Sequence, residues 1–237
     1  MNSTKNPGRF AGLLYVLTSI VGFFAMMYVP DEIIVHGNAA ATASNILAHE
    51  MLFRLGIAGE LIGQAGFIFV AMALYELLKG VNRRQAALMV ILLVVQIPTA
   101  FLNELNSFAA LVLASGADFL STFDKTQRDA LAMLFMNLHG KGFVVNEIFY
   151  GLWLFPLARL VYKSRFLPRF LGVWLALAGL AWVILSLTSV LFPQYQDKVF
   201  NYGQPAFLGE IAFMLWLLIK GAKPPAPDAA ASSLAAA

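Results

Sequence analysis

The segment from Asn137 to Tyr150 reads Asn-Leu-His-Gly-Lys-Gly-Phe-Val-Val-Asn-Glu-Ile-Phe-Tyr, and it sets four polar side chains in an otherwise apolar run. The four are His139, Lys141, Asn146 and Glu147. The run continues on both sides for longer than the roughly 20 residues that a membrane-spanning helix needs. Polar and ionisable groups cost free energy in hydrocarbon, so a cluster of them within a span is a candidate functional site.

The spacing of these side chains predicts which of them act together. On an α-helix, which advances about 100° per residue, His139, Asn146 and Tyr150 share one face. Glu147 lies beside that face, and Lys141 lies roughly opposite His139. The chemistry of the segment is therefore expected on the face that carries the histidine.

Two glycines lie within the same segment. Gly140 and Gly142 are expected to loosen the helix around the polar groups, as broken helices do at transporter sites. A structural role is the alternative, because polar side chains commonly bond neighbouring spans to one another.

The composition of the whole chain agrees with a membrane setting. Of 237 residues, 60% are hydrophobic and 12% are charged, whereas a soluble domain is nearer half apolar and a quarter charged. We predict an all-α, polytopic helical bundle: one transmembrane domain over residues 1–220, followed by a disordered cytoplasmic tail over 221–237. The chain has no cysteine, which excludes disulfides, thiol catalysis and cysteine-bound metal clusters.

Hydropathy predicts six spans, with polar segments at 30–50 and 193–203 between them. The expected spans are 10–29, 51–78, 85–114, 128–162, 170–192 and 204–219. Asn38 is expected to cap a short helix over 39–48 at the membrane interface. Pro98 and Pro156 are expected to bend the third and fourth spans.

The distribution of positive charge predicts the orientation. Cytoplasmic loops carry an excess of Lys and Arg, and most of the 16 such residues fall on one side if both termini are cytoplasmic. We therefore expect a multi-pass protein of the inner (plasma) membrane. The net charge of +3 then reflects topology and gives no indication of nucleic-acid binding.

Further polar groups are predicted inside the other spans. They are Arg54, Glu60, Gln64, Gln96, Asn103, Glu104 and Glu210. In the predicted topology most of these lie in the outer halves of their spans, which favours one shared pocket open to the outer face. Separate hydrogen bonds between helices are the alternative.

The predicted pocket contains more acidic than basic groups. Four glutamates, at positions 60, 104, 147 and 210, face only two cations, Arg54 and Lys141. Each uncompensated charge near the bilayer centre costs about 2.5–3.5 kcal/mol on insertion scales. Some carboxyl groups are therefore expected to be protonated or held by a bound cation. This balance favours a site that binds or moves a small polar or cationic ligand or a lipid headgroup.

An intramembrane enzyme is the alternative function. His49-Glu50 begins a zinc-protease motif, but position 53 is Phe, so the second metal-binding histidine is missing. A divalent metal held by His139 and carboxylates stays open, as does a structural lipid-binding or assembly role. The sequence identifies no cofactor and no oligomeric state.

Several segments together carry a family resemblance. They are 9–15, 39–47, 53–58, 81–83, 116–118, 139–143 and 167–172. They resemble the bacterial membrane-protein family called domain of unknown function 4386, and the resemblance covers nearly the whole chain apart from the tail. It implies a multi-pass bundle and suggests that Arg54 and His139 occupy family motif positions, but it implies no activity.

Overall fold

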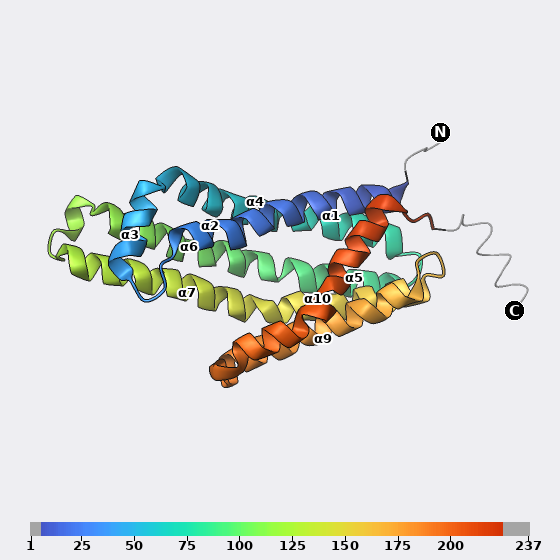
Figure 1. Cartoon of the computed structure of the whole chain (residues 1–237). Coiled ribbons are helices and arrows are strands. Elements are labelled where there is room, and N and C mark those ends of the chain that lie inside the picture. Colours follow the sequence, from blue (N-terminus) through green and yellow to red (C-terminus); the bar gives the residue numbers. More distant parts are fainter. Residues whose placement is uncertain (1–5, 225–237) are drawn as a thin grey trace, which may run out of the picture. The chain divides into compact units, whose positions relative to one another are not determined.

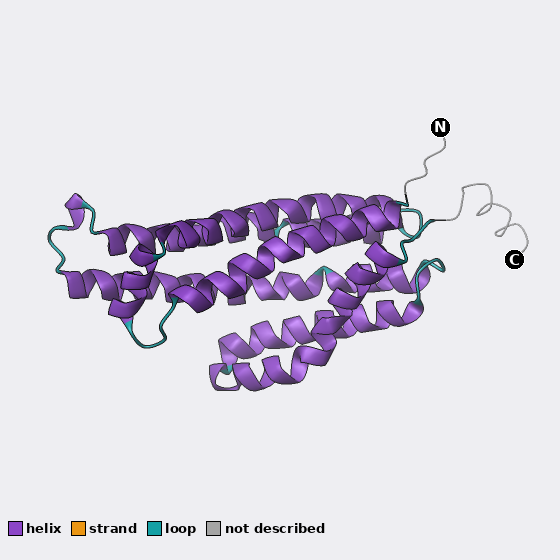
Figure 2. Cartoon of the chain, turned by 45° about the horizontal axis from the view of Figure 1, so that its top comes forward, coloured by secondary structure: helices purple, strands orange, loops and turns teal. Residues whose placement is uncertain are grey.

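The structure is a computed structural model that describes residues 6–224. Within that range all regular structure is helical, and most helices are joined by short loops (Figure 2). The predicted all-α fold is therefore confirmed. The predicted tail lies outside the described residues from position 225 onward.

Six helical stretches within residues 6–224 are long and apolar enough to cross a membrane. They are Pro7–Ile33, Glu50–Leu78, Arg83–Ser115, Lys125–Lys163, Arg169–Leu191 and Pro193–Ile219. Large apolar side chains stay exposed along them, among them Ile62 at 63% and Phe69 at 64%, as a surface that contacts lipid requires. The chain is thus a multi-pass membrane protein. The orientation of its termini and the identity of the membrane stay predictions.

The first span is longer than predicted. It comprises α1 (Pro7–Phe23), a π-helical turn (Phe24–Tyr28) and α2 (Val29–Ile33), so the helix passes through Pro30 where a polar loop was expected. A proline ring crowds the carbonyl group four residues earlier in an α-helix. In the π-helical turn the Val29 amide bonds to the carbonyl oxygen of Phe24, and such wide turns relax the helix around a bulky insertion.

The short interfacial helix has the predicted limits. α3 (Ala39–Ala48) begins after Asn38, whose side-chain oxygen accepts a hydrogen bond from the Ala41 amide at 3.0 Å. This bond satisfies one of the free amide groups at the start of the helix. The second span follows as a single helix, α4 (Glu50–Leu78).

The third span is divided by a proline, as predicted. α5 (Arg83–Val94) and α6 (Gln96–Ser115) meet at Val95, three residues before Pro98 (Figure 1). Proline has no amide hydrogen, so the regular bond to the carbonyl oxygen four residues earlier cannot form. The helix is therefore interrupted just before Pro98, where a kink was predicted.

The fourth span is divided in the same way. α7 (Lys125–Leu152) and α8 (Leu154–Lys163) meet at Trp153, three residues before Pro156. The helix is thus interrupted three residues before Pro156, near the position where a bend was predicted. No break occurs near the polar segment that lies in the middle of α7.

The last two spans are α9 (Arg169–Leu191) and α10 (Gln196–Ile219), which pack side by side (Figures 1 and 2). The predicted loop over 193–203 is wrong, because α10 already begins at Gln196 and contains Pro205. Membrane helices tolerate proline where neighbouring groups satisfy the backbone. Pro205 itself leaves the Asn201 carbonyl oxygen, four residues earlier, without its helical donor. A separate bond, from the indole Nε1 of Trp174 on α9 to the Pro205 carbonyl oxygen at 2.8 Å, joins the two helices.

The described chain falls into two compact units, which we name by their place in the sequence. The terminal unit comprises Met1–Val16, Ile68–Val94 and Glu147–Ala237, and the medial unit comprises Leu17–Phe67 and Val95–Asn146. Each is considered separately below.

Glycines set the rotation of α4 in the medial unit. A Cβ atom on Gly59 would lie 3.0 Å from the Cβ of Ala25 on the first span, and one on Gly63 would lie 3.7 Å from the Cα of Gly22. Gly59 and Gly63, four residues apart, thus form a small-residue edge in close contact with another span. Since each residue turns an α-helix by about 100°, Glu60 lies to one side of this edge, about 100° from Gly59 and about 60° from Gly63.

Glycines also bring helices together in the terminal unit. A Cβ on Gly172 of α9 would lie 2.8 Å from the carbonyl oxygen of Ala158 on α8, and one on Gly179 would lie 2.9 Å from that of Gly151. Gly172 and Gly179 thus form a small-residue edge on the fifth span. Near the chain ends, the Asn6 side chain accepts a hydrogen bond from the Ala222 amide at 3.0 Å.

Candidate functional site

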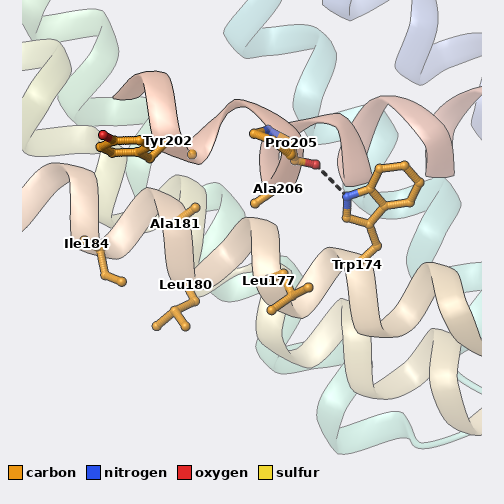
Figure 3. A pocket seen from close by; sticks show the side chains of 9 residues that line it. Trp174, Leu177, Leu180, Ala181, Ile184, Tyr202, Pro205 and Ala206 are labelled. Carbon is orange, nitrogen blue, oxygen red and sulfur yellow. Dashed lines mark hydrogen bonds between the residues drawn. The ribbon is translucent and has the colours of Figure 1, made fainter. Parts of the chain in front are cut away.

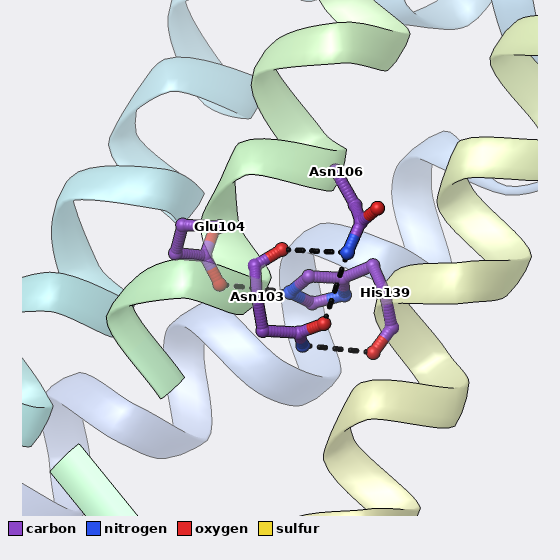
Figure 4. A network of polar contacts seen from close by, with 4 residues as sticks. All are labelled: Asn103, Glu104, Asn106 and His139. Carbon is purple, nitrogen blue, oxygen red and sulfur yellow. Dashed lines mark hydrogen bonds and ion pairs between the residues drawn. The ribbon is translucent and has the colours of Figure 1, made fainter. Parts of the chain in front are cut away.

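A histidine–glutamate pair lies at the centre of the candidate site in the medial unit. His139 Nε2 on α7 lies 2.8 Å from Glu104 Oε1 on α6 (Figure 4). The side chains are 19% and 6% exposed, respectively. The pair therefore joins two spans through an ionisable contact that is largely removed from the protein surface.

Two asparagines on α6 fix this contact. Asn103 Nδ2 donates to the backbone carbonyl oxygen of His139 at 2.9 Å. This bond fixes the α7 backbone at the residue that carries the imidazole. Asn106 Nδ2 in turn donates to the backbone oxygen and the Oδ1 of Asn103, both at 3.1 Å (Figure 4). The orientation of the Asn103 amide is thus set by a second amide one turn away.

The glycines of α7 act differently from the prediction. The expected loosening at Gly140 and Gly142 is wrong, because α7 is continuous from Lys125 to Leu152. A Cβ on Gly142 would instead overlap the Asn103 side chain, whereas one on Gly140 would have no neighbour within 4 Å. Gly142 therefore provides the space in which the Asn103 amide reaches the His139 carbonyl group.

A second carboxyl group reaches the pair from α4. Glu60 is 9% exposed and interacts electrostatically with both Glu104 and His139. We call Glu60, Asn103, Glu104, Asn106 and His139 the polar cluster. Three helices of the medial unit thus contribute to one electrostatic environment.

Three buried oxygen atoms of the medial unit have no hydrogen-bond donor. They are Glu60 Oε1, Gln64 Oε1 and Gln96 Oε1, on side chains that are 9%, 8% and 3% exposed. We call them the open acceptors. Gln64 lies one helical turn from Glu60, so these two acceptors follow one stripe of α4.

The third open acceptor lies on the α6 face that leads to the cluster. Gln96, Thr99 and Asn103 follow one another at helical spacing. Thr99 Oγ1 donates to Asn146 Oδ1 on α7 at 2.6 Å. Thr99 was not among the predicted site residues, although it lies one turn from Asn103 on the same helix.

Two predicted site cations lie away from the cluster. Arg54 pairs with Glu50 one turn earlier, with Nε 2.7 Å from Oε1, and its side chain is 51% exposed. Lys141 is exposed on α7, as its place opposite His139 on the helix predicts. The acidic groups of the cluster therefore have His139 as their basic partner among the predicted site residues.

Two predicted site glutamates belong to the terminal unit. Glu147 is 6% exposed and its Oε2 has no hydrogen-bond donor. Glu210 on α10 accepts a hydrogen bond from the Tyr15 hydroxyl group on α1. The Tyr15 ring lies 6.2 Å from that of Trp153, between centroids.

The arrangement is rich in hydrogen-bond acceptors. Among the described residues no three His, Asp or Glu side chains are placed to hold one metal ion. The cluster combines two carboxyl groups and an imidazole, which exchange protons, with carboxamide oxygens that accept hydrogen bonds. Such a set suits a partner that brings donors and positive charge.

The spans and this buried cluster define a polytopic helical membrane protein with an acceptor-rich polar interior. The chain belongs to the family described as domain of unknown function (DUF4386), whose match covers residues 10–221. It is similar to an uncharacterized protein of Archaeoglobus fulgidus, with 30% identity over 158 residues, which are 66% of this chain and 77% of the relative. No solved structure matches the chain.

Proposed function

We propose that the medial unit binds a small cationic ligand that carries N–H donors, a protonated amine or a related group, between α4, α6 and α7. The observation that carries this proposal is the set of open acceptors: Glu60 Oε1, Gln64 Oε1 and Gln96 Oε1, all buried without a donor. A buried polar atom that makes no hydrogen bond costs about 1–3 kcal/mol. Three of them in one compact unit are explained by donors that arrive with a ligand.

The charge of the cluster supports a cation. Glu60 and Glu104 bring two carboxyl groups, and Glu104 bonds to His139 at 2.8 Å. Glu60 has no ion pair with a Lys or Arg side chain among the described residues. An ammonium group with several N–H donors would bond to the Glu60 carboxylate and offset its charge, and Gln64, one turn away on α4, would accept a further N–H.

The test is a thermal-stability titration of the purified protein in detergent. A ligand that binds only the folded state raises the melting temperature in a saturable way. Methylammonium and guanidinium, which carry N–H donors, should stabilise the wild type, and tetramethylammonium, which has none, should not. Glu60→Gln should abolish the effect, whereas Glu76→Gln, an exposed carboxylate on the same helix, should keep it.

The same titration distinguishes two sources of the amine. Free ethanolamine and the ethanolamine headgroup of a phospholipid present the same ammonium group, so they are added in separate arms. Stabilisation by the free amine indicates a solute site, and stabilisation by the lipid alone indicates a headgroup site. If the wild type and Glu60→Gln respond alike to every cation, the cluster serves packing and the proposal is wrong.

A further inference from the structure

The terminal unit contains a groove between α9 and α10 that is chemically unlike the polar cluster. Its volume is about 560 Å³, within the range of about 300–1,000 Å³ that is usual for ligand sites. α9 contributes Leu177, Ala181 and Ile184 to the lining, and α10 contributes Tyr202 and Ala206 (Figure 3). Most of the lining is hydrocarbon.

Small residues and one hydrogen bond keep the groove open. Gly203 and Ala206 on α10 fill little of the space in front of Ala181 on α9. At the Trp174 end, the indole bonds to the Pro205 carbonyl oxygen at 2.8 Å and joins the two helices (Figure 3). Since that indole donor is already satisfied, the groove offers an occupant apolar surface and few hydrogen bonds.

The Tyr202 end of the groove is polar. Tyr202 is 86% exposed, and Lys198 lies four residues earlier, on the same face of α10. The Lys198 Nζ atom lies 5.8 Å from the centroid of the Tyr195 ring. Tyrosines and lysines of this kind gather where a span leaves the hydrocarbon and meets the lipid headgroups.

The length of the last span supports this placement. The stretch Pro193–Ile219 has 27 residues, which at 1.5 Å per residue is longer than the roughly 30 Å of bilayer hydrocarbon. Lys198 lies near its start, before the apolar part of α10. The lysine can therefore lie at headgroup level while Ile184 and Leu177 of the groove lie among acyl chains.

We propose that the groove binds one acyl chain of an anionic phospholipid, with the lipid phosphate held at Lys198 and Tyr202. The apolar lining matches the chain, and the positive charge at the polar end matches the phosphate. This site is independent of the polar cluster, because its lining residues belong to the terminal unit.

The experiment titrates delipidated protein in detergent with phosphatidylglycerol and with phosphatidylcholine of the same chains. The readout is the apparent affinity from the melting temperature. A lysine near an anionic surface contributes about 1 kcal/mol, so phosphatidylglycerol should bind about fivefold more tightly. Lys198→Gln should remove this preference but keep chain-dependent binding, whereas Asp197→Asn, next to it on the helix, should retain the preference.

Filling the groove tests the acyl-chain part of the proposal. Ala181→Phe should abolish saturable stabilisation by both lipids, and Ala206→Leu serves if that variant does not fold. As a second readout, lipids with brominated chains should quench Trp174 in a protein whose other tryptophans are replaced by Phe, and the filled groove should remove the saturable part of the quenching.

Three results would overturn the proposal. They are equal affinity for the two lipids in the wild type, an unchanged preference in Lys198→Gln, and wild-type binding by a folded filled-groove variant. If two copies of the chain instead pack together at the groove, the filled-groove variants become monomeric in detergent, and neither lipid competes with the second copy for the groove.

Discussion

The two compact units bury different chemistry. The medial unit gathers carboxyl, carboxamide and imidazole groups from three helices, centred on the contact of 2.8 Å between Glu104 and His139. The core of the terminal unit is dominated by side chains such as Leu157, Leu175 and Phe213, which are almost fully buried. Glu210, a glutamate of the terminal unit, accepts a hydrogen bond from the phenol group of Tyr15.

This difference indicates where function lies. Apolar side chains can pack two spans together, and the same side chains can contact lipid at no cost in free energy. A buried carboxyl group costs free energy in hydrocarbon, so its presence there is by default a functional-site hypothesis. The proposed amine site therefore lies in the medial unit, where two carboxyl groups gather around an imidazole, and the proposed lipid groove lies in the terminal unit, which also contains Glu147 and Glu210.

The largest effect is expected when the central pair is broken. Glu104→Leu leaves His139 without its carboxylate, and removing one partner of a buried ion pair costs about 3–5 kcal/mol. We expect Glu104→Leu to lower the free energy of unfolding by about 3 kcal/mol, the low end of this range, because the His139 side chain is 19% exposed. The free energy of unfolding in mixed micelles measures it. The double variant with His139→Leu should lose less than the sum of the single losses, and strict additivity would contradict the pair.

The next largest effect separates two glycines on one helix. Gly142→Ala should cost about 1–3 kcal/mol, as overpacking does, because the new methyl group overlaps the Asn103 side chain. Gly140→Ala meets no atom within 4 Å and should stabilise the helix by about 0.5–1 kcal/mol. Unfolding titrations of the two variants side by side give the comparison, and equal values would show that Asn103 is free to move.

A smaller loss is expected in the terminal unit. Tyr15→Phe removes the hydroxyl group that donates to Glu210, and a lost hydrogen bond to a carboxyl group costs about 1–2 kcal/mol. The loss should lower the melting temperature but leave the amine titration unchanged, since neither residue belongs to the medial unit. An altered amine response in this variant would remove the functional distinction between the units.

The smallest effect concerns the edge of the candidate site. Thr99→Val keeps the shape of the side chain but deletes the hydroxyl group, whose oxygen lies 2.6 Å from Asn146 Oδ1 and 2.6 Å from the Gln96 carbonyl oxygen. Hydrogen bonds between membrane helices contribute about 0.6 kcal/mol on average, so we expect a loss of that size. A double-mutant cycle with Asn146→Ala measures the coupling of the two residues, and a coupling of zero would show that the bond does not stabilise the fold.

Local rules predicted most of the fold. Hydropathy located the spans because each is a continuous apolar run, Asn38 capped α3 because its side chain bonds to the next turn, and prolines divided the third and fourth spans. The start of α10 at Gln196 was missed, because Gly203 and Pro205 are turn residues in water. In membrane-spanning helices glycine and proline are more frequent than in helices of soluble proteins.

The candidate site was predicted only in part. Depth in the membrane grouped Glu147 and Glu210 with Glu104, but depth carries no information on helix rotation or on which helices are neighbours. The pairing of Arg54 was predictable from the local sequence, because Glu50 lies one turn earlier and its Oε1 is 2.7 Å from the arginine Nε. Contacts such as that of Asn103 with the His139 carbonyl join residues 36 positions apart, and a single sequence does not specify them.

The π-helical turn Phe24–Tyr28 gives the first span a tolerance for deletion. Such a turn holds one residue more than an α-helical turn, and elsewhere in a helix the loss of one residue rotates everything beyond it by about 100°. Deleting Met26 would let the wide turn close to an α-helical one, so the residues on either side would keep their directions, although the Pro30 ring would again crowd the carbonyl group four residues before it. The span thus carries one residue that it can lose without changing which side chains face α4.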